Sequence, residues 1–154
     1  MRSKKGFTLI ELLIVIAVIG ILASAVLIGL GPVQKRGRDA RRVSDLRQTQ
    51  NALELYNTKY TQYPDATDWD TLTTTLTDPT TGVVNVLPND PLGSRDPADK
   101  YQYGVNATHD SYTLRATLED TSSNILKGSV HGSDVNGQDC GAVDDTNGFY
   151  CVQL

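Results

Sequence analysis

The sequence predicts an α+β fold, in which the second half of a long N-terminal α-helix packs on a small C-terminal antiparallel β-sheet. Three observations predict it: an uncharged apolar run over residues 12–30, apolar residues at helical spacing as far as Tyr60, and short alternating segments after residue 100. Helices followed by strands are typical of the α+β class. The 154 residues leave room for about one domain.

Charge is distributed unevenly along the chain. Residues 1–42 carry eight basic and two acidic side chains, whereas residues 43–154 carry six basic and sixteen acidic ones. The larger part would repel a polyanion, which disfavours nucleic acid as a partner. The basic run RGRDARR, residues 36–42, has no interleaved aromatic residues. We therefore interpret it as a solvated or inter-subunit face.

The apolar run is long enough to cross a bilayer. Residues 12–30 contain no charge, and about twenty apolar helical residues span the hydrocarbon core. A removable secretory signal is the alternative, because residues 23–25, Ala-Ser-Ala, resemble a cleavage site. However, the run continues to Leu30 and has Glu11 at its start, where an ionised carboxylate in hydrocarbon costs about 3 kcal/mol. These features favour a retained helix in which Glu11 has a function.

The motif that precedes this run, KGFTLIELL at residues 5–13, resembles the class III signal of type IV pilins and of the pseudopilins of type II secretion systems. The resemblance implies that a prepilin peptidase cuts after Gly6, that Phe7 is then N-methylated, and that the apolar helix stays in the mature subunit. It also implies a pilin-like fold and a helical homo-polymer, assembled with a membrane platform protein and an ATPase. In such a filament Glu11 pairs with the amine of a neighbouring Phe7, which sets the register because either charge alone is unfavourable there.

The resemblance also implies the orientation of the helix. The peptidase site faces the cytoplasm, so the protein crosses the cytoplasmic (inner) membrane once with its N-terminus inside. After assembly, the subunit belongs to an extracytoplasmic or cell-surface filament. The basic residues after the apolar run favour the opposite orientation by the positive-inside rule, and we follow the motif. These outer cations are then expected near headgroups or acidic patches of neighbouring subunits. They are Lys35, Arg36, Arg38, Arg41 and Arg42.

A helix break is expected at Gly29, Gly31 and Pro32, because glycine weakens a helix and proline lacks the N–H donor. Beyond it, apolar residues recur at steps of three, four or seven and predict one buried stripe. The stripe consists of Val33, Ala40, Val43, Leu46, Leu53, Tyr56 and Tyr60. Four parts are therefore expected: a leader (1–6), an apolar helix (7–31), an amphipathic half (32–64) and a loop-and-sheet domain (65–154).

The last of these parts has weaker signals. A short helix is expected within residues 65–76, with Asp68 or Asp70 near its start. Strands are expected at residues 101–105 and 112–118, and less clearly at 125–130 and 149–152. The segment LPNDPLG, residues 87–93, is similar to the LP-x-DP-x-G segment that precedes the first strand of major pseudopilins.

The C-terminal region suggests two ways of fixing a loop. Cys140 and Cys151 make a poor zinc site with so little histidine nearby, so we expect a disulfide and an oxidising compartment. The resemblance to major pseudopilins also implies calcium, whereas a C-terminal disulfide loop is a feature of type IVa pilins. The oxygen-bearing side chains match only part of an EF-hand loop, so exposed turn residues are the alternative. The candidate ligands are Asp134, Asn136, Asp139, Asp144 and Asp145.

No catalytic pattern is recognisable: His109 and His131 are isolated, and neither a nucleophile elbow nor a phosphate-binding loop occurs. We therefore expect a structural filament subunit, a major pilin or pseudopilin, and not an enzyme. The alternative is a minor or competence-type pilin. Such a pilin would act as a binding module at a filament tip, for a surface, a secreted protein or DNA.

Overall fold

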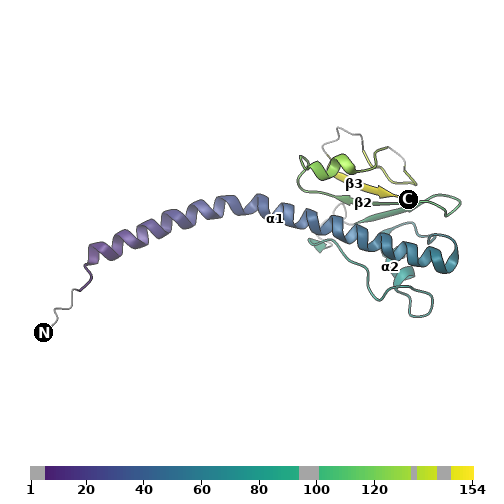
Figure 1. The fold of residues 1–154 in the computed structure, drawn as a ribbon, viewed down its shortest axis with the longest axis horizontal. Coiled ribbons are helices and arrows are strands. Elements are labelled where there is room, and N and C mark those ends of the chain that lie inside the picture. The colour runs from purple at the N-terminus through teal and green to yellow at the C-terminus, as the bar shows by residue number, and fades with distance from the viewer. Residues whose placement is uncertain (1–5, 94–100, 133–134, 142–146) are drawn as a thin grey trace. The chain divides into compact units, whose positions relative to one another are not determined.

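A computed structural model describes residues 6–93, 101–132, 135–141 and 147–154, without the side chains of residues 26–29. The chain divides into two compact units, Met1–Lys35 and Arg36–Leu154. Helix α1 (Leu9–Tyr60, 52 residues) belongs to both (Figure 1). The apolar spacing predicted helix as far as Tyr60, and α1 ends at that residue.

The first unit consists of the N-terminal part of α1. In the described part of the chain, no single helix is both long and apolar enough to span a membrane. The segments Leu9–Ala25 and Leu30–Tyr60 form a bent pair, and together they are long and apolar enough to span a membrane by length and composition. Pro32 lies inside α1. The break expected at Gly29, Gly31 and Pro32 stays a prediction.

In the second unit, the face of α1 that is buried changes character along the helix. Leu46 and Leu53 are fully buried, and Val43 and Tyr56 pack against the core, as the apolar stripe predicted. Val33 and Ala40 are exposed, so their assignment to the stripe was wrong. In the first turns of this unit the buried positions are polar, and they are Asp39, Arg42, Asp45 and Thr49. Hydrophobic periodicity detects only apolar faces, and it therefore missed them.

Helix α2 (Trp69–Thr77) is short and begins directly after an N-cap residue. The Asp68 carboxylate accepts a hydrogen bond of 2.7 Å from the backbone N–H of Thr71, which is the N-cap geometry expected for this residue type. Trp69, Leu72 and Leu76 point into the core. The predicted short helix is confirmed, with Asp68 as its cap.

The described residues form one antiparallel sheet of three strands in the order β1 (Gln102–Val105), β2 (Tyr112–Thr117), β3 (Phe149–Gln153). Leu114 pairs with Tyr103 on one side and Val152 on the other. Tyr112, Leu114 and Ala116 join the α1 residues in one core cluster, which confirms the α+β class.

Residues 125–130 do not form the strand that was expected. The 3₁₀ helix η3 (Asn124–Gly128) occupies most of this stretch, and the Ser123 hydroxyl accepts from the N–H of Ile125 at its start. Local capping by serine competes with sheet pairing and explains the difference. After η3, the backbone N–H of Val130 donates a hydrogen bond of 3.0 Å to the carbonyl of Cys151 in β3.

Candidate functional site: the N-terminal segment and the Arg42 cluster

The predicted cleavage site lies just before α1. Gly6 and Phe7 are exposed, their backbone is not helical, and the Phe7 residue is 85% exposed. A peptidase binds its substrate in an extended form, and exposed irregular backbone is where cleavage is most easily accommodated. The arrangement suits cleavage between Gly6 and Phe7, which stays a prediction.

Thr8 and Glu11 form a capping box at the start of α1. The backbone N–H and hydroxyl of Thr8 donate to Glu11 Oε2 at 2.8 and 2.6 Å, and the N–H of Glu11 donates to Thr8 Oγ1 at 3.4 Å. This reciprocal pattern satisfies two backbone donors that a helix start would leave open. The sequence interpretation missed it, although the spacing Thr-x-x-Glu is its signal.

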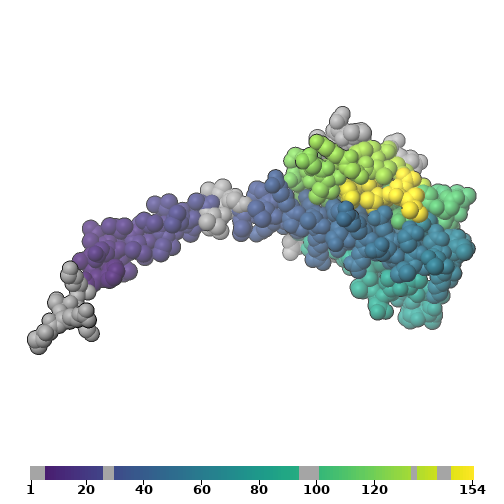
Figure 2. Space-filling view, viewed as in Figure 1, coloured from purple at the N-terminus to yellow at the C-terminus, as the bar shows by residue number. Residues whose placement is uncertain are grey.

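The helix behind this cap presents apolar side chains to its surroundings. All residues of Leu9–Ala25 are exposed, with large apolar residues ranging from 47% exposed at Val15 to 80% at Leu9 (Figure 2). A continuous apolar surface of this extent marks a membrane or protein interaction site. The first unit therefore requires lipid or other apolar helices around it.

In the second unit, a buried group of charges surrounds Arg42. We define the Arg42 cluster as Arg38, Asp39, Arg42, Asp90 and Glu119. Arg42 is fully buried and binds Asp90 through Nε at 2.6 Å and Nη2 at 3.1 Å, a bidentate arrangement. Its Nη1 donates to Asp39 at 2.8 Å and to Glu119 at 2.9 Å. Asp90 belongs to the LPNDPLG segment, so the cluster fixes that segment to α1.

The same cluster also holds the chain that leaves β2. The Asp39 carboxylate accepts from the N–H groups of Glu119 and Asp120, each at 2.9 Å. Arg38 donates to Glu119 through Nε at 2.6 Å and Nη2 at 2.5 Å. Two helix cations and one helix carboxylate thus join three segments that are distant in sequence.

These contacts keep the cluster ionised. Hydrogen bonds from Arg38 hold the pKa of the Glu119 carboxyl at about 2, although partial burial opposes this shift. Burial alone would lower the pKa of Arg42, but its bonds to Asp90, Glu119 and Asp39 raise it above its ordinary value. The charges are compensated internally, as buried charges must be.

The cluster corrects the interpretation of residues 36–42 as a solvated or inter-subunit face. Arg38 and Arg42 are bonded within their own domain, whereas Arg36 and Arg41 remain 74% and 62% exposed in their side chains. A basic run gives no local sign of which members turn inward, because the partners Asp90 and Glu119 lie 48 and 77 residues away.

The C-terminal residues cover the second face of the sheet. Cys140 and Cys151 form the expected disulfide, with Cα atoms 5.9 Å apart, and Cys151 lies in β3. Asn136 donates to the Thr113 hydroxyl at 3.1 Å, and Arg115 donates to the carbonyl of Asp139 at 2.6 Å. The tail is thereby attached to the sheet covalently and by polar contacts.

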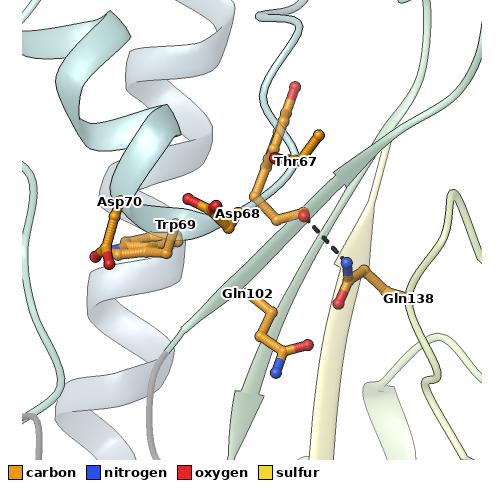
Figure 3. A pocket seen from close by; sticks show the side chains of 7 residues that line it. Thr67, Asp68, Trp69, Asp70, Gln102 and Gln138 are labelled. Carbon is orange, nitrogen blue, oxygen red and sulfur yellow. Dashed lines mark hydrogen bonds between the residues drawn. The ribbon is translucent and has the colours of Figure 1, made fainter. Parts of the chain in front are cut away.

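Beside this tail, a hollow of about 380 Å³ lies between the start of α2 and β1. In Figure 3 the Gln138 amide reaches across to the strand, where it donates to the carbonyl of Tyr103 at 3.0 Å. Asp68, Trp69 and Asp70 line the opposite side. The hollow therefore marks where the tail is fastened at the edge of β1.

The expected calcium ligands are only partly visible. Asp134, Asp144 and Asp145 lie outside the described residues. Asn136 uses its NH₂ group toward Ser111 and Thr113, and the Asp139 carboxylate accepts from the N–H of Gly141 at 2.9 Å. Within the described ranges no group of three or more His, Cys, Asp or Glu side chains could hold a metal ion. Calcium binding stays a prediction.

Comparison with known proteins gives a consistent set of relatives. A family model described as "Prokaryotic N-terminal methylation motif" matches residues 1–27. Type II secretion system core protein G of Vibrio cholerae is 35% identical over 127 residues, covering 75% of this chain and 83% of the relative. The Aeromonas hydrophila protein of the same name is 33% identical over 103 residues, covering 60% and 71%. Type IV wide pilus major component PilA4 of Thermus thermophilus is 45% identical over 64 residues, covering 40% and 49%. No solved structure matches significantly.

Proposed function

Because this chain belongs to the family of type IV pilins and type II secretion major pseudopilins, we propose that it polymerises from the cytoplasmic membrane into a helical filament as a major structural subunit. The observation that carries the proposal is the exposed apolar surface of Leu9–Ala25 directly behind the cleavage motif. In water this surface is unfavourable, whereas lipid and a bundle of identical helices both cover it.

The proposed life of the subunit has two stages. It is first stored as a single-pass protein of the cytoplasmic membrane, with the leader inside and the second unit outside. The disulfide supports this orientation, because such bonds persist in oxidising extracytoplasmic spaces. A prepilin peptidase then cuts after Gly6 and Phe7 is methylated. A membrane platform protein and its ATPase are the partners required for polymerisation.

The proposed role of Glu11 is to pair with the amine of Phe7 on a neighbouring copy. Removing the leader creates that amine one residue before the Thr8 cap, and the capping box holds the Glu11 carboxylate in the first helical turn. Two charges brought together in an apolar bundle each compensate the other, while a misplaced helix leaves both unpaired. The pair would therefore select the correct depth of an incoming subunit.

The secretion branch has the better support among the two filament systems. The match to the Vibrio cholerae protein extends over 83% of that relative, whereas the match to PilA4 extends over 49% of it. We propose that the filament is a secretion pseudopilus. Deleting the gene should then abolish protein export, while loss of motility or attachment with normal export would indicate a pilus instead.

Mass spectrometry of the native protein and of sheared filaments tests the proposal. A mature chain that begins at N-methylated Phe7, and that dominates the purified filaments, is the expected result. A chain present only at low stoichiometry would support the tip-binding alternative. A secreted monomer that begins beyond Ala25 would contradict both.

A further inference from the structure

Strand β1 lies at one edge of the sheet, and the ladder shows which of its backbone groups face outward. In the described residues β1 pairs with β2 alone. The N–H of Asn106 donates to the carbonyl of Ser111 at 3.1 Å, so these two residues form a hydrogen-bonded pair at the end of the hairpin. Such pairs alternate along an antiparallel ladder, and the N–H and C=O groups of Val105 and Tyr103 therefore face away from β2. They are the groups with which a further strand would pair.

Strand β1 lacks the features that usually protect an edge strand from pairing with another chain. Its sequence, Gln-Tyr-Gly-Val, contains neither a charge nor a proline. Its register with β2 runs from Gln102 to Val105 without a bulge. An edge of this kind is a template for strand addition, and native proteins otherwise cover such edges with a loop or a helix. Protection of β1 therefore has to come from another segment.

The tail supplies this cover. The Gln138 amide donates to the outward-facing carbonyl of Tyr103 at 3.0 Å, and Tyr103 is fully buried (Figure 3). Hollows of about 380 and 310 Å³ adjoin this contact, and Gln138 and Tyr103 line both of them. The amide of Gln138 thus takes the position that a backbone N–H of an added strand would occupy.

The opposite edge of the sheet is covered in a similar way. The N–H of Cys151 donates to Ser129 Oγ at 2.8 Å, and its carbonyl accepts from the N–H of Val130 at 3.0 Å. Cys151 is also bridged to Cys140, which follows Gln138 by two residues. The disulfide therefore connects β3 to the segment that covers β1.

We propose that the tail is a guard, held in place by the disulfide, that prevents β1 from pairing with β1 of a second copy of the chain. Such a pairing is antiparallel and two-fold symmetric, so that Tyr103 of each copy would exchange hydrogen bonds with Val105 of the other. No charge on β1 opposes it. The inference goes beyond filament formation, because it concerns a contact that the guarded subunit does not make.

Native mass spectrometry of the full-length protein in detergent tests the inference by measuring the fraction of dimer at a fixed protein concentration. The variants are Gln138→Ala and the matched control Gln48→Ala, which changes an exposed glutamine of α1. We expect the dimer fraction to rise about 5-fold in Gln138→Ala, because the Tyr103 carbonyl loses its hydrogen-bond donor, and to stay unchanged in Gln48→Ala. Replacing both Cys140 and Cys151 by alanine removes the bridge and should raise the dimer fraction as well.

Adding Gln102→Lys to Gln138→Ala identifies the surface that associates. A lysine on an edge strand disfavours strand addition, so the double variant should return to the dimer fraction of the natural protein. Association through a misfolded domain would not respond to this charge and would count against the inference. An unchanged dimer fraction in Gln138→Ala would overturn it. All variants carry the same apolar helix, so failure of the filament proposal would not alter these differences.

Discussion

At the scale of single residues, the Glu11 carboxylate has two roles, one in the capping box of its own helix and one in the proposed pairing with a neighbouring copy. It accepts from the backbone N–H and the hydroxyl of Thr8 within its own helix start. The proposed filament pairing requires the same oxygen atoms to meet the amine of another copy. A carboxylate can accept several hydrogen bonds, so the cap can orient Glu11 without consuming it.

Glu11→Gln and Glu11→Ala separate these two uses. Glutamine keeps the capping box but removes the charge, whereas alanine removes both. We expect both variants to be inserted and cleaved, and both to be absent from sheared filaments because the amine has lost its partner. Immunoblots of membranes and filament fractions measure this. Normal filament yield from Glu11→Gln would show that the cap is the essential function.

Arg42 is expected to be the residue of the cluster most costly to remove. In Arg42→Met the apolar stem is kept, but the carboxylates of Asp39 and Asp90 lose their buried cation. The free energy of unfolding should fall by about 3–5 kcal/mol. Chemical denaturation in detergent, followed by near-ultraviolet circular dichroism, measures it. The exposed Arg41→Met is the control, with an expected change below about 0.5 kcal/mol, and comparable losses in both would contradict this account.

At the scale of elements, the attachment of the tail depends on a close approach between two backbones. Asn136 and Gly137 both have positive φ and form a tight turn in which Val135 and Gln138 exchange hydrogen bonds of 2.8 and 3.0 Å. The turn lies directly over β1, where a Cβ atom on Gly104 would come within 2.1 Å of the Asn136 carbonyl oxygen. Glycine at position 104 is therefore required by the tail.

Gly104→Ala should displace the turn from β1 and lower the free energy of unfolding by about 1–3 kcal/mol, as overpacking does. Hydrogen exchange should be faster at the backbone N–H of Gln138. Chemical denaturation should show the lower free energy of unfolding. Gly128→Ala is the matched control, because the added Cβ would meet no atom within 4 Å beyond its own neighbouring backbone. Unchanged exchange in Gly104→Ala would show that the tail does not need this contact.

The sequence was informative about elements whose determinants are local. The Asp68 cap and the apolar spacing of Trp69, Leu72 and Leu76 predict α2, and alternation predicts β2. The Arg42 cluster and the capping box were missed for different reasons. The capping box has a local signal, the spacing Thr-x-x-Glu from Thr8 to Glu11. The cluster joins side chains 48 and 77 residues apart, and no local pattern encodes such a pairing.

At the scale of the whole molecule, stability should depend on acid through Glu119. Its pKa is about 2 in the folded protein against an ordinary value of 4.5, because Arg38 and Arg42 bind the ionised form. Its contribution is complete above about pH 5 and is lost as the pH falls from about 4.5 toward 2, since the unfolded chain takes up the proton first. The loss from this group reaches at most about 1.4 kcal/mol per pH unit.

Glu119→Gln tests this dependence, because the variant has no proton to gain at this position. We expect it to be less stable than the natural protein at pH 7, by about 1–3 kcal/mol. The two unfolding free energies should converge as the pH approaches 2. Denaturation curves collected at intervals between pH 7 and 2 measure the difference. A constant difference over the whole range would exclude Glu119 as the titrating group.

The position of β3 has a consequence for export under the proposed topology. Residues 149–153 supply the third strand of the sheet, and Cys151 closes the ring with Cys140. The sheet therefore cannot close until about residue 153 has crossed the membrane. Until then the third strand is missing, and Cys140 and Cys151 meet only on the oxidising side. The order of residues along the chain thus makes the third strand and the disulfide the last parts of the sheet to be completed.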